Sequence, residues 1–158
     1  MTTTHTTGST LGTDDLDLLA AVLETILPGD DEMPPASKTG AAHAIDGYLT
    51  ERPALRAPFL DALVAIRITA HAHGGEFGAL PEASRVATLE AVEAAHPHAF
   101  DTLLVQAYTG YYTDPNVQAR LGVPSPLMPL GHPRATSGTL DSARLNRVRA
   151  TAKPWRKA

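Results

Sequence analysis

Histidine is the residue type of this sequence that most readily suggests chemistry, because an imidazole can bind a metal ion or carry a proton. The chain of 158 residues has seven histidines, and the two closest pairs are His71-Ala-His73 and His96-Pro-His98. A helix places residues i and i+2 about 200° apart, so a helical His71 and His73 cannot bind the same ion. A loop site that uses His73 and Glu76 is one alternative, and a structural role at the negative end of a helix is the other.

Other catalytic and cofactor-binding patterns are missing from the sequence. The absence of cysteine excludes disulfides, thiolate-ligated zinc, iron–sulfur clusters and cysteine nucleophiles. The glycine-rich stretch from Gly74 to Gly78 follows a predicted helix rather than a strand, so the dinucleotide-binding mechanism does not apply. The acidic run Asp30-Asp31-Glu32 lacks the alternating acids and closing glutamate of a calcium loop. We therefore predict no catalytic, cofactor-binding or metal-binding residue in this chain, with a stand-alone histidine-based metal protein or enzyme as the alternative.

Three tyrosines lie within about two predicted helical turns, in the segment Tyr108-Thr-Gly-Tyr-Tyr112. Gly110 between them allows another backbone to approach closely. Tyrosine is enriched at protein interfaces, so Tyr108, Tyr111 and Tyr112 are predicted to contact a partner. The alternative is that this end of the helix packs on the domain's own core.

The elements that must position these residues are predicted to be helices. Aromatic residues make up only 5% of the chain, so alanine and leucine fill most of the interior, which favours close-packed helices over a sheet. Apolar spacings of three and four, bounded by prolines, glycines and capping residues, predict helices over residues 13–26, 39–51, 54–72, 82–95 and 98–112. Two minor helices are expected after Asp114 and Thr139. The predicted fold class is all-α, a compact bundle of about five main helices.

The same patterns predict which residues cap the helices and which face inward. Thr13 is the expected N-cap of the first helix, and Thr39 that of the second. The helix over 54–72 carries a broad apolar surface, which predicts a central helix that is covered on more than one side. In the two helices that follow it, the predicted inward side chains are Val86, Leu89, Val92, Phe100, Leu103, Leu104, Ala107, Tyr108 and Tyr111.

The two ends of the chain differ in composition from the helical body, which we predict over residues 13–122. Residues 1–12 are rich in Thr, Ser and Gly and are expected to be disordered. Residues 123–158 begin as a proline-rich arm and end as a basic tail, with seven Lys/Arg against one acid. Residues 1–133 carry six Lys/Arg against sixteen Asp/Glu, so the chain is acidic everywhere except in this tail.

We expect the arm and tail to lie along a partner protein. Four prolines within residues 124–133 limit the backbone freedom that binding would remove, and the basic tail suits an acidic surface. The predicted contact residues are Leu127, Met128, Leu130, Arg144 and Arg147. The alternative is that the arm folds back on the chain's own acidic body. A nucleic-acid partner is not expected, because the formal net charge is −4.

No targeting or membrane-spanning segment is predicted. The first ten residues lack the positive n-region, twin arginine and apolar run of an export signal. Continuous apolar runs are only a few residues long, too short to cross a bilayer. The expected location is the cytoplasm, with the periplasm as the less favoured alternative.

Four segments, taken in order, share the signature of one known family. The segment Leu23-Glu-Thr-Ile-Leu-Pro-Gly-Asp-Asp-Glu-Met-Pro-Pro-Ala36 is similar to a helix followed by I-L-P-x-D-x-x-P-x-A, and Gly40-Ala-Ala-His-Ala-Ile-Asp-Gly-Tyr48 matches an I-D-x-Y stretch. Gly74 to Leu80 sits where the family has a Phe-containing turn, and Tyr108-Thr-Gly-Tyr-Tyr-Thr-Asp-Pro115 matches its G-Y-Y-x-x-P ending. Over about residues 14–132 the chain thus resembles the gluconate 2-dehydrogenase subunit 3 family.

The resemblance implies the small, cofactor-free subunit of a dehydrogenase complex. Its implied partner is a large FAD-dependent flavoprotein of the glucose–methanol–choline oxidoreductase type, which oxidises a hydroxyl of a sugar, sugar acid or glycoside, often alongside a cytochrome c. The implied role of the small subunit is to support folding, stability and, in some members, export. Exported members often carry a twin-arginine leader, which this sequence lacks, so a soluble two-subunit oxidoreductase fits it better than a cytochrome-coupled one.

Overall fold

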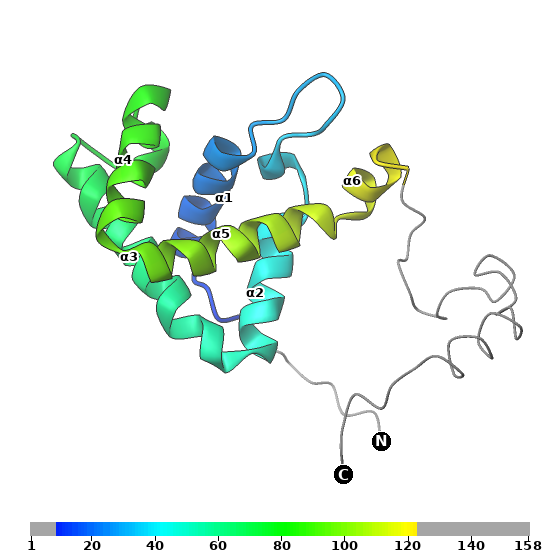
Figure 1. Ribbon diagram of the computed structural model, residues 1–158, viewed down its shortest axis with the longest axis horizontal. Coiled ribbons are helices and arrows are strands. Elements are labelled where there is room, and N and C mark those ends of the chain that lie inside the picture. Colours follow the sequence, from blue (N-terminus) through cyan, green and yellow to red (C-terminus); the bar gives the residue numbers. More distant parts are fainter. Residues whose placement is uncertain (1–8, 123–158) are drawn as a thin grey trace, which may run out of the picture. The chain divides into compact units, whose positions relative to one another are not determined.

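The computed structural model describes residues 9–122, and all regular structure within them is helical (Figure 1). The α-helices are α1 (Thr13–Ile26), α2 (Ala41–Glu51), α3 (Arg56–Ala72), α4 (Glu82–Ala95), α5 (Pro97–Tyr112) and α6 (Pro115–Arg120). Between them lie the 3-10 turns η1 (Ala36–Lys38), η2 (Pro53–Leu55) and η3 (Phe77–Ala79). The all-α prediction and its five main helices are confirmed. The predicted arm and basic tail, 123–158, lie outside the described residues.

Helix α5 crosses the middle of the bundle (Figure 1). It packs against α2, α3 and α4, while α1 lies against α2 and the turns η1 and η3. The prediction that α3 is covered on more than one side is confirmed, because α3 packs against α1, α4 and α5 and the turns η2 and η3. Its apolar surface is wider than these elements cover, and Val64 and Ile68 remain 49% and 66% exposed.

The core is built mainly from aliphatic side chains, as the low aromatic content predicts. Its largest fully buried members are Phe59, Phe77, Leu19, Leu23, Ile45, Leu49, Leu63, Ile66, Leu103, Val22, Val92 and Val117. Two predicted inward residues are wrong, because Val86 is 41% and Tyr108 42% exposed. Val86 lies on the flank of the buried face of α4. Tyr108 directly follows the buried Ala107, and one residue turns a helix by about 100°, which points Tyr108 away from the core.

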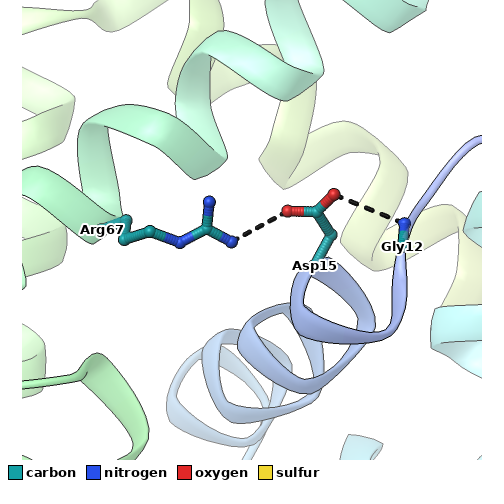
Figure 2. Close-up of polar contacts among 3 residues, drawn as sticks. All are labelled: Gly12, Asp15 and Arg67. Atoms are coloured by element: carbon teal, nitrogen blue, oxygen red, sulfur yellow. Dashed lines mark hydrogen bonds and ion pairs between the residues drawn. The ribbon is translucent and has the colours of Figure 1, made fainter.

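The first turn of α1 is capped differently from the prediction. Gly12, not Thr13, is the N-cap, because Gly12 still has an extended backbone with φ −75° and ψ 170°. Asp15 Oδ2 accepts a hydrogen bond from Gly12 N at 3.4 Å, and Asp15 Oδ1 pairs with Arg67 Nη2 of α3 at 2.9 Å (Figure 2). The same carboxylate therefore caps α1 and connects it to α3. Both side chains are partly solvated, so the ion pair contributes at most about 1 kcal/mol to stability.

The start of α2 is capped from two sides. Its N-cap is Gly40 rather than the predicted Thr39, but the Thr39 hydroxyl accepts a hydrogen bond from Ala41 N at 3.2 Å. The backbone N–H of Gly40 donates to Asp114 Oδ2 at 2.9 Å, and Asp114 comes from the turn between α5 and α6. The beginning of α2 is thus held by a residue more than seventy positions later in the chain.

Candidate docking surface

The loop between α1 and α2 carries the first signature segment, and two of its residues determine its shape. Asp30 Oδ1 accepts hydrogen bonds from Met33 N at 2.7 Å and Glu32 N at 2.8 Å, and these bonds lower the pKa of the Asp30 carboxyl. Gly29 has a φ of +76°, and a Cβ at this position would collide with the backbone of Pro35. The turn therefore requires glycine at 29 and benefits from an ionised aspartate at 30.

Tyr111 anchors this loop to α5. Its hydroxyl donates to the carbonyl oxygen of Pro34 at 2.7 Å, and its ring is buried. Burial raises the pKa of the Tyr111 hydroxyl, and the neighbouring Tyr112 raises it further, so the hydroxyl stays protonated and able to donate. Arg120 of α6 adds a second anchor, because its Nη1 donates to the carbonyl oxygen of Glu32 at 2.7 Å.

Tyr111→Phe is expected to lower the free energy of unfolding by about 1.5 kcal/mol, because the Pro34 carbonyl loses its donor while the ring packing is kept. The matched control is Tyr48→Phe, which removes the exposed contact of the Tyr48 hydroxyl with Thr113 Oγ1 at 3.1 Å. That control should cost less than about 0.5 kcal/mol. Urea unfolding followed by circular dichroism measures both, and equal losses would contradict an anchoring role for Tyr111.

Asp114 joins two elements, α2 and α6, through one buried carboxylate. Its Oδ2 accepts from Gly40 N at 2.9 Å, and its Oδ1 accepts from Asn116 N at 2.8 Å and Val117 N at 3.4 Å. Burial alone would raise the pKa of Asp114, but the three backbone N–H groups outweigh it and hold the pKa below its usual value. Asp114 is thus the N-cap of α6 and also holds the start of α2.

Gly110 sets how closely α5 approaches α2. A Cβ on Gly110 would lie 2.9 Å from the carbonyl oxygen of Ala41 and 3.0 Å from Ile45 Cγ1. Because the first of these atoms is backbone, any side chain at 110 would push the two helices apart. This is the close backbone approach that the glycine between the tyrosines predicted, and the approaching backbone is that of α2.

Asp46, in the I-D-x-Y stretch, fastens the start of the described chain to α2. Its Oδ1 accepts from Thr10 N and Leu11 N, both at 2.8 Å, and its Oδ2 accepts from Ser9 Oγ at 2.8 Å. The carboxylates of Asp30 and Asp114 likewise accept hydrogen bonds from backbone N–H groups. These three signature aspartates therefore support the fold.

The histidines do not form a ligand set in the part of the chain that the structure describes. Across residues 9–122, no three side chains among His, Asp and Glu come together in a way that could hold a metal ion. His73 Nδ1 lies 2.8 Å from Thr88 Oγ1, whose own hydrogen is donated to the Ser84 carbonyl at 2.7 Å. His73 therefore donates to Thr88, and this bond links the end of α3 to α4 instead of forming a site with Glu76.

Two of the three predicted tyrosines lie on the surface of α5. Tyr108 and Tyr112 are 42% and 46% exposed, and their rings stack with centroids 6.3 Å apart and planes 19° apart. Tyr111 turns into the core and meets Tyr112 edge-on at 5.2 Å. Val105, which the sequence reasoning missed, extends the exposed pair, and its spacing of three before Tyr108 could have revealed it. We name Val105, Tyr108 and Tyr112 the tyrosine ridge.

The remaining predicted contact residues lie outside the described residues. They are Leu127, Met128, Leu130, Arg144 and Arg147. Of the predicted contact residues, the structure describes Tyr108, Tyr111 and Tyr112, and of these Tyr108 and Tyr112 are exposed whereas Tyr111 is buried.

Fold and surface together define an all-helical module in which several signature residues support the structure, while Tyr108 and Tyr112 of the same signature lie exposed on the tyrosine ridge. The family model of gluconate 2-dehydrogenase subunit 3 matches residues 13–122, and the chain belongs to this family. Membership implies a subunit of a multi-subunit dehydrogenase complex. Comparison with curated proteins gave no match, and comparison with solved structures gave none either. Of the helices in residues 9–122, none is long and apolar enough to cross a membrane.

Proposed function

We propose that this chain is the non-catalytic small subunit of a flavin-dependent oxidoreductase, and that it binds and stabilises a large subunit of the glucose–methanol–choline type. Family membership supports a place in a dehydrogenase complex. In this proposal the large subunit carries FAD and oxidises a hydroxyl of a sugar or glycoside, and a cytochrome c is a further candidate subunit. The arm residues Leu127, Met128, Leu130, Arg144 and Arg147 add to the contact with the large subunit.

The tyrosine ridge is the observation that carries the proposal. Two stacked aromatic rings and a valine are exposed on a helix whose opposite face is buried in the core. Aromatic side chains on a rigid helix lose little conformational entropy when a partner covers them, so they suit a binding surface. Tyrosine is also among the residues that contribute most to measured binding energies. The histidine-based alternative has no comparable support, because His73 is engaged with Thr88.

Co-expression with a flavoprotein encoded next to this chain tests the proposal. We expect a stable complex, and the melting temperature of the flavoprotein should rise when this chain is bound. The double variant Tyr108→Ser/Tyr112→Ser should raise the dissociation constant about thirtyfold, because it removes both aromatic contacts. Val86→Ser is the matched control, since Val86 is similarly exposed on α4 but lies off the ridge.

Two results would contradict the proposed function. One is an isolated chain that binds FAD stoichiometrically, which absorbance of the purified protein detects. The other is a flavoprotein whose melting temperature is the same with and without this chain. If the ridge variant binds as tightly as Val86→Ser, the proposed complex still stands, but the tyrosine ridge is not part of its interface.

A further inference from the structure

A groove runs along the uncovered face of α3, beside the connection between α4 and α5. It encloses about 540 Å³, and its apolar lining consists of Pro58, Val64, Ala65, Ile68, Pro97 and Ala99. Ile68 is the most exposed large apolar side chain of residues 9–122. A volume of this size holds a small-molecule-sized group, or roughly one or two large side chains. The groove is therefore large enough to receive an anchor residue of another protein.

The groove and the tyrosine ridge belong to one continuous strip of surface. His98 lines the groove, and from it the exposed residues Asp101, Val105, Tyr108 and Tyr112 follow along α5. Their spacings alternate between three and four, which keeps all five side chains on one side of the helix. At 1.5 Å per residue, the strip from 98 to 112 is about 21 Å long.

The charges on this strip have a single sign. Asp61 lines the groove and Asp101 lies on the strip, whereas neither Lys nor Arg occurs among the residues that line the groove or form the strip. Both arginines of α3 are engaged elsewhere: Arg56 donates to the backbone carbonyls that end α2, and Arg67 pairs with Asp15. Residues 9–122 as a whole hold six Lys/Arg against sixteen Asp/Glu, a balance of −10.

We propose that the groove and the tyrosine ridge form one docking surface for the large subunit, and that the matching face of the large subunit is apolar and basic. An apolar side chain of the partner fills the groove against Val64 and Ile68, and Lys or Arg side chains lie opposite Asp61 and Asp101. This inference rests on the proposed function and adds to it the extent of the interface and the chemistry of the partner. Charge complementarity of this kind speeds encounter and sets orientation.

The test uses the complex of the full chain with the co-expressed flavoprotein. Val64→Ser/Ile68→Ser should raise the dissociation constant about tenfold or more, because the groove loses its apolar wall. Asp61→Asn should slow association and reduce its dependence on salt, with little change in the dissociation rate. The matched controls are Val86→Ser for exposed apolar area and Glu90→Gln for charge, since both residues are exposed on α4 away from the groove. Circular dichroism confirms that each variant is folded.

Each outcome decides the inference. Weaker binding by the groove variants with unchanged controls supports it. Groove variants that bind like the controls, while Tyr108→Ser/Tyr112→Ser binds weakly, would overturn it and leave the proposed function standing. If no complex forms even with the unaltered chain, the proposed function fails and this inference fails with it. The competing occupant of the groove is the chain's own segment after Gly122. If that segment occupied the groove, Val64→Ser/Ile68→Ser without the flavoprotein would expose Trp155 to water and shift its emission to the red. Such a red shift would overturn the inference.

Discussion

Gly110→Val is expected to lower the free energy of unfolding by about 3 kcal/mol. A Cβ at this position would lie 2.9 Å from the Ala41 carbonyl oxygen, and this oxygen cannot move without the backbone of α2. The branched side chain would therefore separate α2 from α5, and this separation would strain the Tyr111 and Asp114 bonds beside it. Urea unfolding followed by circular dichroism measures the loss.

Gly47→Val is the control for this substitution. Gly47 lies on α2, and a Cβ at this position would have no neighbouring atom within 4 Å, so valine meets open space there. Valine is slightly better than glycine within a helix, and the stability should change by less than about 0.5 kcal/mol. Similar losses at 47 and 110 would show that the close approach of the two helices does not determine the stability.

Asp114→Ala is expected to lower the free energy of unfolding by about 3 kcal/mol, because three backbone N–H groups lose their acceptor. Asp114→Asn should fall between the wild type and alanine. Its one remaining oxygen can still cap Asn116 and Val117, but its amide group would face the Gly40 N–H, donor against donor. If Asp114→Asn lowers the free energy of unfolding as much as Asp114→Ala does, the negative charge of Asp114 is what stabilises the fold, and the presence of two acceptor oxygens is not.

The contribution of Asp114 should also depend on pH, with a definite sign. Its pKa in the folded chain lies below the ordinary value of 3.8, so the stabilisation is fully present above that value. It is lost as the pH falls through the lower folded pKa. The difference in unfolding free energy between wild type and Asp114→Ala should therefore shrink below about pH 4. A difference that stays constant to lower pH would contradict an ionised Asp114. Asp30, whose pKa is also lowered, acts in the same direction in both proteins.

The helix boundaries could be predicted because their signals are local. Pro28 and Gly29 follow the end of α1, Pro53 follows α2, and Gly74 follows α3 closely. Proline lacks an N–H and glycine readily leaves helical backbone, so each affects its own neighbourhood whatever the rest of the chain does. The same locality explains why Asp114 and Pro115 correctly predicted the start of α6.

The choice between neighbouring caps and faces was less predictable. Thr13 and Gly12 are both acceptable N-caps, and the ion pair of Asp15 with Arg67 adds a tertiary contact at that turn which the local sequence does not contain. Tyr108 is apolar enough for a core position, yet the crossing of α5 over its neighbours buries the face around Ala107 instead. Periodicity defines an apolar face to within a residue or two, and the neighbouring helix decides its edges.

Tyr108 and Tyr112 of the proposed docking surface could be singled out from the sequence, but Val105 was not, and the bonding partners of Tyr111, Asp114 and Arg120 could not be predicted. Tyr111 bonds to a residue 77 positions away, Asp114 to one 74 away and Arg120 to one 88 away. Hydrophobic spacing and chain-breaking residues act over one or two turns, so they determine helices and not pairs of this separation. The packing of α5 against α2 brings these groups within hydrogen-bonding distance. Likewise, α4 and α5 cover only part of the apolar surface of α3, so Val64 and Ile68 stay exposed.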